Sequence, residues 1–271
     1  MQDHLFSDSP DPSKRKYRSF WADVGETFPD LGDAWSTDYY RLDEQRLFRD
    51  HLGDLRDLKV LKTDLWDEAK NTRILRWAAR QGAEAHGVDI SPAIVGTASR
   101  EFERVGERLH ASQGDVRALP YATSSFDAVY SMGTVEHFDE TTKAVAEIFR
   151  VLRPGGTAIV GVPNRWDPFL RPLMVATMYR VGLYGYGFEK SYSRRGLREM
   201  LVQAGFEIVA ETGILFVPGF LRILDLACNA WARPLSVVTG AACWPFSAAS
   251  RNSAFLQRHG YLLATVARRP D

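Results

Sequence analysis

The sequence contains little cysteine and has no excess of charge of either sign. Its 271 residues include two cysteines, Cys228 and Cys243, which are too few for a disulfide framework and lack the paired spacing of a zinc site. We expect both to be reduced and buried. Lys and Arg together number 34, as do Asp and Glu, so the formal net charge is zero. This balance gives no electrostatic reason to expect a nucleic-acid partner.

Long uncharged apolar runs are also missing. The most apolar late stretch, residues 214–246, is interrupted by Arg222, Asp225 and Arg233, and no 18 consecutive residues lack a charge. We therefore expect no membrane-spanning helix. The N-terminus, Met1 to Lys16, is rich in Asp, Ser, Pro and Lys and has no apolar signal-peptide core. That composition predicts a cytoplasmic protein with a disordered start.

The clearest pattern in the chain is a strand, a helix and a second strand between residues 126 and 162. Phe126 to Tyr130 is a short apolar run bounded by serines and a glycine, as is typical of a buried strand. Residues 145–152 carry apolar side chains at three- and four-residue spacing, which indicates a helix that Pro154-Gly155-Gly156 should end. Thr157 to Val162 reads as the next strand. This order implies parallel pairing, so we predict an α/β fold.

Five landmarks occur in order along the same part of the chain. They are Gly114-Asp115 with Leu119-Pro120 and Phe126-Asp127, then Glu136-His137, Leu152-Arg153-Pro154-Gly155-Gly156 and Pro163-Asn164. With these motifs the chain resembles the class I S-adenosylmethionine-dependent methyltransferases, particularly the small-molecule group that includes the ubiquinone-biosynthesis O-methyltransferases. The resemblance extends over roughly residues 59–268. It implies a seven-stranded, mostly parallel Rossmann-like sheet with helices on both faces, and S-adenosyl-L-methionine as the cofactor.

This resemblance also sets the expected order of elements. Strands are expected at Lys59 to Leu65, Ala83 to Ile90, His110 to Asp115, Phe206 to Phe216 and Tyr261 to Val266, and a helix at Ala69 to Arg80. The family places the last strand antiparallel between the fifth and sixth. We expect an N-terminal helical segment over residues 1–58 and a methyltransferase-like domain over residues 59–271. Tyr39 or Tyr40 of the first segment either lines the cofactor cleft or packs against the core.

Two apolar insertions, residues 165–191 and 217–259, depart from a minimal fold of this class. Loops of such length carry structure or function of their own. We expect the insertions to form a lid and an apolar pocket for a small-molecule acceptor, and their composition is compatible with peripheral contact with a membrane. A dimer interface or an extra structural cap is the alternative. The sequence does not set the oligomeric state.

The loop after the first strand lacks glycine. Related methyltransferases have an acidic residue at the end of this strand and three glycines after it, whereas this chain has residues 62–68, KTDLWDE, with Trp66 where small size matters most. In one interpretation Asp64 or Asp67 pairs with the cofactor ammonium and Lys62 faces its carboxylate. In the other, Trp66 fills part of the pocket, so that binding is weak or directed to another ligand. The remaining landmarks favour the first interpretation.

The resemblance assigns further cofactor contacts to residues at the ends of later strands. Asp89, with Ile90 beside it, corresponds to the acidic position that accepts hydrogen bonds from the ribose hydroxyls; its alternative role is to cap the helix that starts at Pro92. Asp115 and Val116 correspond to the position beside the adenine amino group. Met132 lies in the segment that lines the methionine end. These places lie at the carboxyl ends of parallel strands, where open α/β sheets bind ligands.

Methyl transfer from a sulfonium is an in-line displacement, and a hydroxyl acceptor also needs a base. His137 is the best candidate base, with Glu136 as its neighbour; otherwise His137 serves only to start a helix. The leading hypothesis is therefore a methyltransferase that O-methylates a small apolar or aromatic acceptor without a metal. A second is a methyltransferase-like protein that has lost the cofactor and acts in binding or scaffolding. A nicotinamide-dependent Rossmann enzyme is disfavoured, because its glycine-rich turn should occupy the same glycine-free loop.

Overall fold

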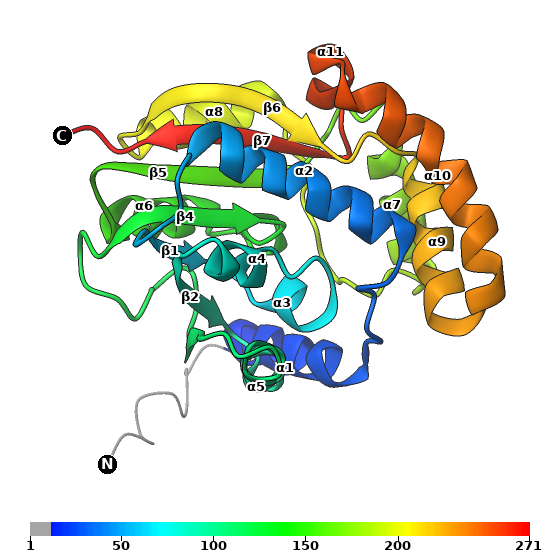
Figure 1. Ribbon diagram of the computed structural model, residues 1–271, viewed down its shortest axis with the longest axis horizontal. Helices are drawn as coiled ribbons and strands as arrows, with labels where there is room; N and C mark the ends of the chain where they lie inside the picture. Colours follow the sequence, from blue (N-terminus) through cyan, green and yellow to red (C-terminus); the bar gives the residue numbers. More distant parts are fainter. Residues whose placement is uncertain (1–11) are drawn as a thin grey trace.

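A computed structural model describes residues 12–271 of the chain, with side chains from residue 19 onward. A disordered start was predicted for Met1 to Lys16; its first 11 residues lie outside the described part, and residues 12–16 are helical, so the prediction was wrong for these. From Pro12 the chain forms helix α1 (Pro12–Thr27). The N-terminal segment then continues as α2 (Trp35–His51), which lies across the sheet in Figure 1.

Seven strands form a single sheet at the centre of the molecule (Figure 1). They are β1 (Lys59–Lys62), β2 (Glu84–Asp89), β3 (His110–Gln113), β4 (Phe126–Met132), β5 (Leu152–Pro163), β6 (Glu207–Ile214) and β7 (Leu262–Arg268). Their spatial order is β3-β2-β1-β4-β5-β7-β6. Strands β3, β2, β1, β4 and β5 pair in parallel, whereas β7 runs antiparallel to both β5 and β6. The predicted α/β class and the antiparallel last strand are confirmed.

Helices cover both faces of this sheet. The remaining ones are α3 (Trp66–Lys70), α4 (Ile74–Arg80), α5 (Pro92–Glu103), α6 (Thr141–Val151), α7 (Arg171–Arg180), α8 (Arg194–Gln203), α9 (Gly219–Trp231), α10 (Ser236–Arg251) and α11 (Ala254–Arg258), with 3-10 turns at Val135–His137 and Arg233–Leu235. Buried residues of α2, α4 and α5 pack on one face of the sheet, and those of α6 and α8 pack on the other.

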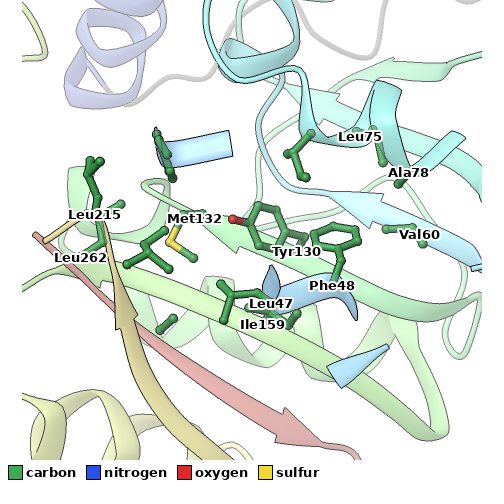
Figure 2. Close-up of a cluster of buried hydrophobic side chains, with 14 of the residues drawn as sticks. Leu47, Phe48, Val60, Leu75, Ala78, Tyr130, Met132, Ile159, Leu215 and Leu262 are labelled. Atoms are coloured by element: carbon green, nitrogen blue, oxygen red, sulfur yellow. The ribbon is translucent and has the colours of Figure 1, made fainter. Parts of the chain in front are cut away.

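Alternation along the central strands divides the core into two layers. Val60 and Tyr130 face α2 and α4, whereas the neighbouring Leu61 and Val129 face the other side. Figure 2 shows Tyr130 beside Phe48 of α2, with 5.0 Å between the ring centroids. The Tyr130 hydroxyl donates a hydrogen bond of 2.7 Å to the carboxylate of Glu44, which satisfies the polar end of this buried ring.

The helix predicted over Ala69 to Arg80 is broken into α3 and α4, so that prediction was wrong over residues 71–73. Arg73 takes a left-handed backbone conformation (φ 57°) between them. The Glu68 carboxylate accepts the backbone amides of Leu75 and Arg76 at 2.8 and 3.1 Å, which satisfies the free donors at the start of α4. A side chain of α3 thus caps α4. The break falls between Lys70 and Ile74, where the sequence has no proline or glycine to mark it.

Several strand boundaries also differ from the prediction, by one or two residues at β3 and β6 and by more at two places. Helix α6 ends at Val151, before the Pro154-Gly155-Gly156 turn, and β5 begins at Leu152. The strand pairing jumps here, since Leu152 lies opposite Phe126 but Thr157 lies opposite Ala128. Strand β1 stops at Lys62 rather than at the predicted Leu65. The residues freed at its end form the loop of the candidate site.

The two insertions lie at one end of the sheet as helices α7, α9, α10 and α11, where α9 and α10 form an adjacent pair (Figure 1). Cys228 of α9 and Cys243 of α10 are buried and free, in agreement with the predicted burial. Across residues 12–271, no helix combines the length and the apolar character needed to cross a membrane.

Glycine is absent from the loop after β1 but present opposite it. Gly87 of β2 faces Leu65, and a Cβ atom at position 87 would lie 2.3 Å from Leu65 Cδ2. The bulky loop residue therefore fits because the neighbouring strand has no side chain at this point. The close approach brings the Leu65 amide within 2.9 Å of the Asp89 carboxylate.

This contact yields a test of the packing. Gly87→Ala should lower the free energy of unfolding by about 1–3 kcal/mol, because Leu65 is buried and has no room to move away. Chemical denaturation measures the change. Gly96→Ala is the matched control, since its Cβ would meet only Arg100 Nη1 at 3.4 Å within helix α5. We expect that variant to be unchanged or slightly more stable. Equal stability of both variants would contradict the account of Leu65.

Candidate functional site

A cavity of about 1280 Å³, counted with its open mouth, lies at the carboxyl ends of the parallel strands. Eight of the nine residues predicted to form the site line this cavity: Asp64, Asp89, Ile90, Asp115, Val116, Met132, Glu136 and His137. The ninth, Lys62, does not. The sheet brings the eight together because β1, β2, β3 and β4 are neighbours that end at the same edge.

Lys62 lies beneath the cavity and is completely buried. Its Nζ donates hydrogen bonds to the carboxylates of Asp64 and Asp67 at 2.8 and 3.0 Å. Burial opposes the charge of Lys62, but the two carboxylates outweigh it and raise the pKa of the ammonium above its ordinary value. This position argues against the direct ligand contact predicted for Lys62. Instead, Lys62 is the counter-ion of both Asp64 and Asp67. Because it carries a single positive charge, one of the two acids has no matching charge.

Asp64 and Asp67 both line the cavity, and each has a second partner. Thr134, just after β4, donates to the other Asp64 oxygen at 2.9 Å, and Asn71 donates to the other Asp67 oxygen at 2.8 Å. The Asp64 side chain keeps 16% of its surface exposed, whereas Asp67 keeps 6%. Asp64 is thus the more accessible carboxylate for a cationic ligand.

Trp66 begins helix α3 and also lines the cavity. Its ring makes edge-on contacts with Phe28 and Tyr186, with centroid distances of 5.1 and 5.8 Å. The indole is therefore held within an aromatic group contributed by the N-terminal segment and the first insertion. It forms part of the wall and leaves the ends of β1, β2 and β4 open to the cavity.

Asp89 lies at the end of β2 with its carboxylate held by two backbone amides. Leu65 donates to one oxygen at 2.9 Å and Ser91 to the other at 2.8 Å. Burial raises the pKa of Asp89 to about 7. The helix cap itself comes from Ser91, whose hydroxyl accepts the Ile94 amide, so Asp89 supports the start of α5 indirectly. Each carboxylate oxygen retains a lone pair for a further donor.

Asp115 and Val116 follow β3 on the same side of the cavity as Ile90. The Asp115 carboxylate is held in bidentate fashion by Arg117, with Nε and Nη2 at 2.9 and 2.6 Å from its two oxygens. Met132 at the end of β4 is buried against Gly161, where a side chain would overlap its thioether. These residues form a continuous wall between the ends of β3 and β4.

Glu136 is buried, lines the cavity and has an unpartnered oxygen. Its Oε2 makes no hydrogen bond, although the side chain is only 2% exposed. Burial raises the pKa of Glu136 well above its usual range, and nearby Glu189 adds to the effect. A buried, unsatisfied carboxyl in a cavity wall is a strong candidate for ligand contact, because leaving it unpaired costs free energy.

His137 lies next to Glu136 and packs edge-on against Trp21, with ring centroids 4.8 Å apart. Its Nδ1 is 2.8 Å from the carbonyl oxygen of Phe188. A carbonyl only accepts hydrogen bonds, so we assign the proton to Nδ1, which leaves Nε2 as the acceptor. Burial lowers the pKa of His137, and the neutral form favoured in this way is able to take up a proton.

Tyr40, for which a place in the cleft was one of two alternatives, lines the cavity. Among the lining residues that were not predicted are Tyr184, Tyr186, Glu189, Arg222 and Tyr261, which come from the insertions or directly precede β7. Glu189 forms a buried ion pair with Arg171, at 2.5 and 2.9 Å, and accepts the Tyr184 hydroxyl at 2.6 Å. The dense aromatic run of the first insertion and the charges within the apolar second insertion were the sequence signals for this wall.

Carboxyl groups outnumber cationic groups in the lining. The lining acids are Asp64, Asp67, Asp89, Asp115, Glu136 and Glu189, and Arg222 is the lining guanidinium. Such a wall suits a ligand that carries positive charge, such as a sulfonium or an ammonium. The other half of the cavity is aromatic and aliphatic. The arrangement suits a polar cationic ligand at the β2–β4 end and a less polar one beside the insertions.

Residues 70–160 match the family model described as "Methyltransferase domain". A demethylmenaquinone methyltransferase of Thermus thermophilus is 37% identical over 29% of this chain and 36% of that protein. Another, from Chlorobaculum parvum, is 25% identical over 76% of this chain and 92% of that protein. The chain thus spans about a third of the first relative and most of the second.

Solved structures share the whole fold at lower identity. The [4+2]-cyclase SpnF superposes with a TM-score of 0.60 over 94% of both chains, at 19% sequence identity. At this identity the likeness concerns the fold alone. The name of that protein also illustrates that one fold serves more than one reaction, so the chemistry of this chain must be argued from its own residues.

Proposed function

The chain belongs to the class I S-adenosylmethionine-dependent methyltransferase superfamily, and from this premise we propose that it transfers a methyl group to a small apolar or aromatic acceptor. The observation that carries the proposal is the gathering of Asp64, Asp89, Asp115 and Glu136 around one cavity at the carboxyl ends of the strands. We expect the cofactor at the β2–β4 end and the acceptor beside the insertions. The acceptor atom would be a hydroxyl oxygen.

The cavity residues fit this cofactor. Asp89 has lone pairs for the ribose hydroxyls, and the acidic surplus around Lys62 leaves Asp64 suited to an ammonium. Asp115, Val116 and Ile90 would line the adenine, and Met132 the methionine chain. When bound, the cofactor supplies an electrophilic methyl group. The protein holds donor and acceptor in line and excludes water with the insertion helices.

Proton removal falls to His137. Its Nδ1 is engaged by the Phe188 carbonyl, and its lowered pKa keeps the ring neutral near pH 7. A neutral imidazole next to an acceptor hydroxyl takes up the proton as the oxygen attacks the methyl group. The raised pKa of Glu136 favours its protonated form, which donates a hydrogen bond to the acceptor rather than removing a proton.

The alternative of a binding protein without cofactor is less well supported. It required Trp66 to fill the space left by missing glycines, but the indole packs sideways against Phe28 and Tyr186. It also leaves the unpaired Glu136 oxygen without a role.

Helix α9 suggests where the protein meets a membrane. Its exposed apolar residues Phe220, Leu224 and Trp231 share one face, and its buried residues Arg222 and Asp225 lie on the other, which reverses the usual pattern. The acids of residues 165–191 and 217–259 are Asp167, Glu189 and Asp225, and all have buried side chains. The two insertions thus expose tryptophan and arginine but no carboxylate of their own, and the exposed acid beside them is Asp33 of the N-terminal segment, which pairs with Arg233 at 3.1 Å. A surface with this excess of arginine over exposed acid suits an anionic bilayer.

The pKa of Asp89 leads to a prediction for cofactor binding. Ribose hydroxyls favour the ionised carboxylate, so at low pH binding must first remove its proton. Affinity for S-adenosylhomocysteine should therefore rise from about pH 6 to pH 8 and level off above the pKa of about 7. Asp89→Asn should flatten this dependence and weaken binding at least about tenfold. Titration calorimetry measures both effects. The exposed Asp139→Asn is the control, and a parallel pH profile in Asp89→Asn would refute the assignment.

A second prediction separates the two interpretations of the loop after β1. Asp64→Asn should weaken binding of S-adenosylhomocysteine at least about tenfold, because it removes the charge that pairs with the ammonium. Trp66→Gly should not tighten binding, since the indole lies to the side. Calorimetry decides, with the exposed Trp166→Gly as control. Tighter binding by Trp66→Gly together with an unchanged Asp64→Asn would favour a blocked pocket instead.

A third prediction concerns the exposed face of α9 and the start of α10. The protein should sediment with vesicles containing phosphatidylglycerol and much less with pure phosphatidylcholine. Trp231→Ser combined with Val237→Ser should reduce this binding several-fold, because both side chains are more than two-thirds exposed, at 78% and 71%. Val202→Ser, at an exposed position of α8, is the control and should have no effect. A concentration-dependent dimer that these substitutions abolish, without vesicle binding, would instead identify a subunit interface.

A further inference from the structure

The second insertion places a guanidinium inside the acceptor half of the cavity. Arg222 of α9 is 7% exposed and lines the cavity. Its Nη1 donates to the Ser36 carbonyl at 3.1 Å. The guanidinium carbon lies 5.3 Å from the ring centre of Tyr40 and 5.8 Å from that of Tyr261. The charge is thus held in place by two rings and a backbone carbonyl.

Among the described residues, Arg222 has no carboxylate partner. No Asp or Glu oxygen in the part of the chain with described side chains lies within 4.0 Å of its guanidinium nitrogens, whereas the buried Arg171 is matched by Glu189, which lines the same cavity. The nearest acid along the helix, Asp225, accepts the Ser36 amide and the Thr239 hydroxyl, both at 2.7 Å. Its two oxygens therefore have other partners.

A buried guanidinium without an anion is costly in free energy, and it offers five N–H donors in a fork that matches a carboxylate. The Ser36 carbonyl takes one of these donors. The cavity already supplies the rest of a pocket around this charge, because Ile223 and Leu226 of the same helix line it. The wall thus combines one cation with an apolar surround.

The order of the sheet places this charge away from the proposed ribose and adenine contacts, whereas Asp64 and Met132, proposed for the methionine end, belong to the strand ends in between. Asp89 ends β2 and Asp115 follows β3, whereas Tyr261, which the guanidinium contacts, directly precedes β7. Strands β1, β4 and β5 lie between them. Resting on the proposed function, we propose that Arg222 binds a carboxylate on the methyl acceptor, so that the substrate is an apolar or aromatic carboxylic acid. The carboxylate of the cofactor's methionine moiety is the other source of the same chemistry.

The test uses the full chain and matched pairs of acid and amide. With saturating S-adenosylhomocysteine, calorimetry should show 3,4-dihydroxybenzoate or decanoate binding at least about tenfold more tightly than the corresponding amide. Arg222→Gln should abolish this preference and change the affinity for S-adenosylhomocysteine less than twofold. Arg222→Lys should retain part of it. Arg233→Gln, an exposed arginine of the same insertion, is the control and should behave as the wild type.

Three results would overturn the proposal. The first is that the wild type shows no preference for the acid over the amide in either pair. The second is that the preference persists in Arg222→Gln. The third is that Arg222→Gln weakens only the binding of the cofactor product and leaves the binding of the acids unchanged. In the last case Arg222→Gln would weaken S-adenosylhomocysteine but not its decarboxylated analogue, which would assign the charge to the methionine carboxylate. If Arg222→Gln fails to fold, the wild-type pairs still decide. If the wild type does not bind S-adenosylhomocysteine, the proposed function fails, and acid preference measured without it tests Arg222 alone.

Discussion

The buried ammonium of Lys62 must be neutralised where water does not reach it, and this requirement fixes the loop that forms the cavity floor. An isolated buried charge costs several kcal/mol, so the chain has to return carboxylates to it immediately after β1. Asp64 and Asp67 do so within five residues. Their positions in turn set the path of the loop and the start of α3. The same geometry leaves Asp64 on the cavity side, where Thr134 of the neighbouring strand end also holds it.

This loop keeps the close approach to β2 that glycines provide in related proteins, but by another route. The Leu65 amide reaches the Asp89 carboxylate because Gly87 leaves room for the leucine side chain. In this chain the glycine lies on β2, opposite the loop, instead of in the loop itself. The contact between the loop backbone and the carboxylate at the end of β2 is therefore made without any of the three glycines.

The sheet could be predicted from the sequence because apolar periodicity and the family landmarks agree, and parallel strand ends bring their following residues together. For this reason Asp89, Asp115 and Glu136 were placed correctly around one cavity, although their roles stay predictions. The burial of Lys62 was not predicted, because a four-residue strand does not reveal which polar side chain turns inward. Nor did the sequence show the Glu68 cap that divides α3 from α4, since that cap depends on three-dimensional contact. The insertion residues were missed because no sheet register constrains their path.

Helix α9 links the two halves of the proposed function. Residues three and four apart share a face of a helix, so one set of positions turns Arg222 and Asp225 inward while another turns Leu224 and Trp231 outward. The inward face supplies a cation to the acceptor half of the cavity, and the outward face is apolar and free of exposed acid. An apolar carboxylic acid dissolved in a bilayer would suit both faces, because its apolar part shares the membrane with the outward face and its carboxylate pairs with the inward cation. A single amphipathic element would then select where the protein docks and which end of the acceptor it holds, which explains why its polar side is buried.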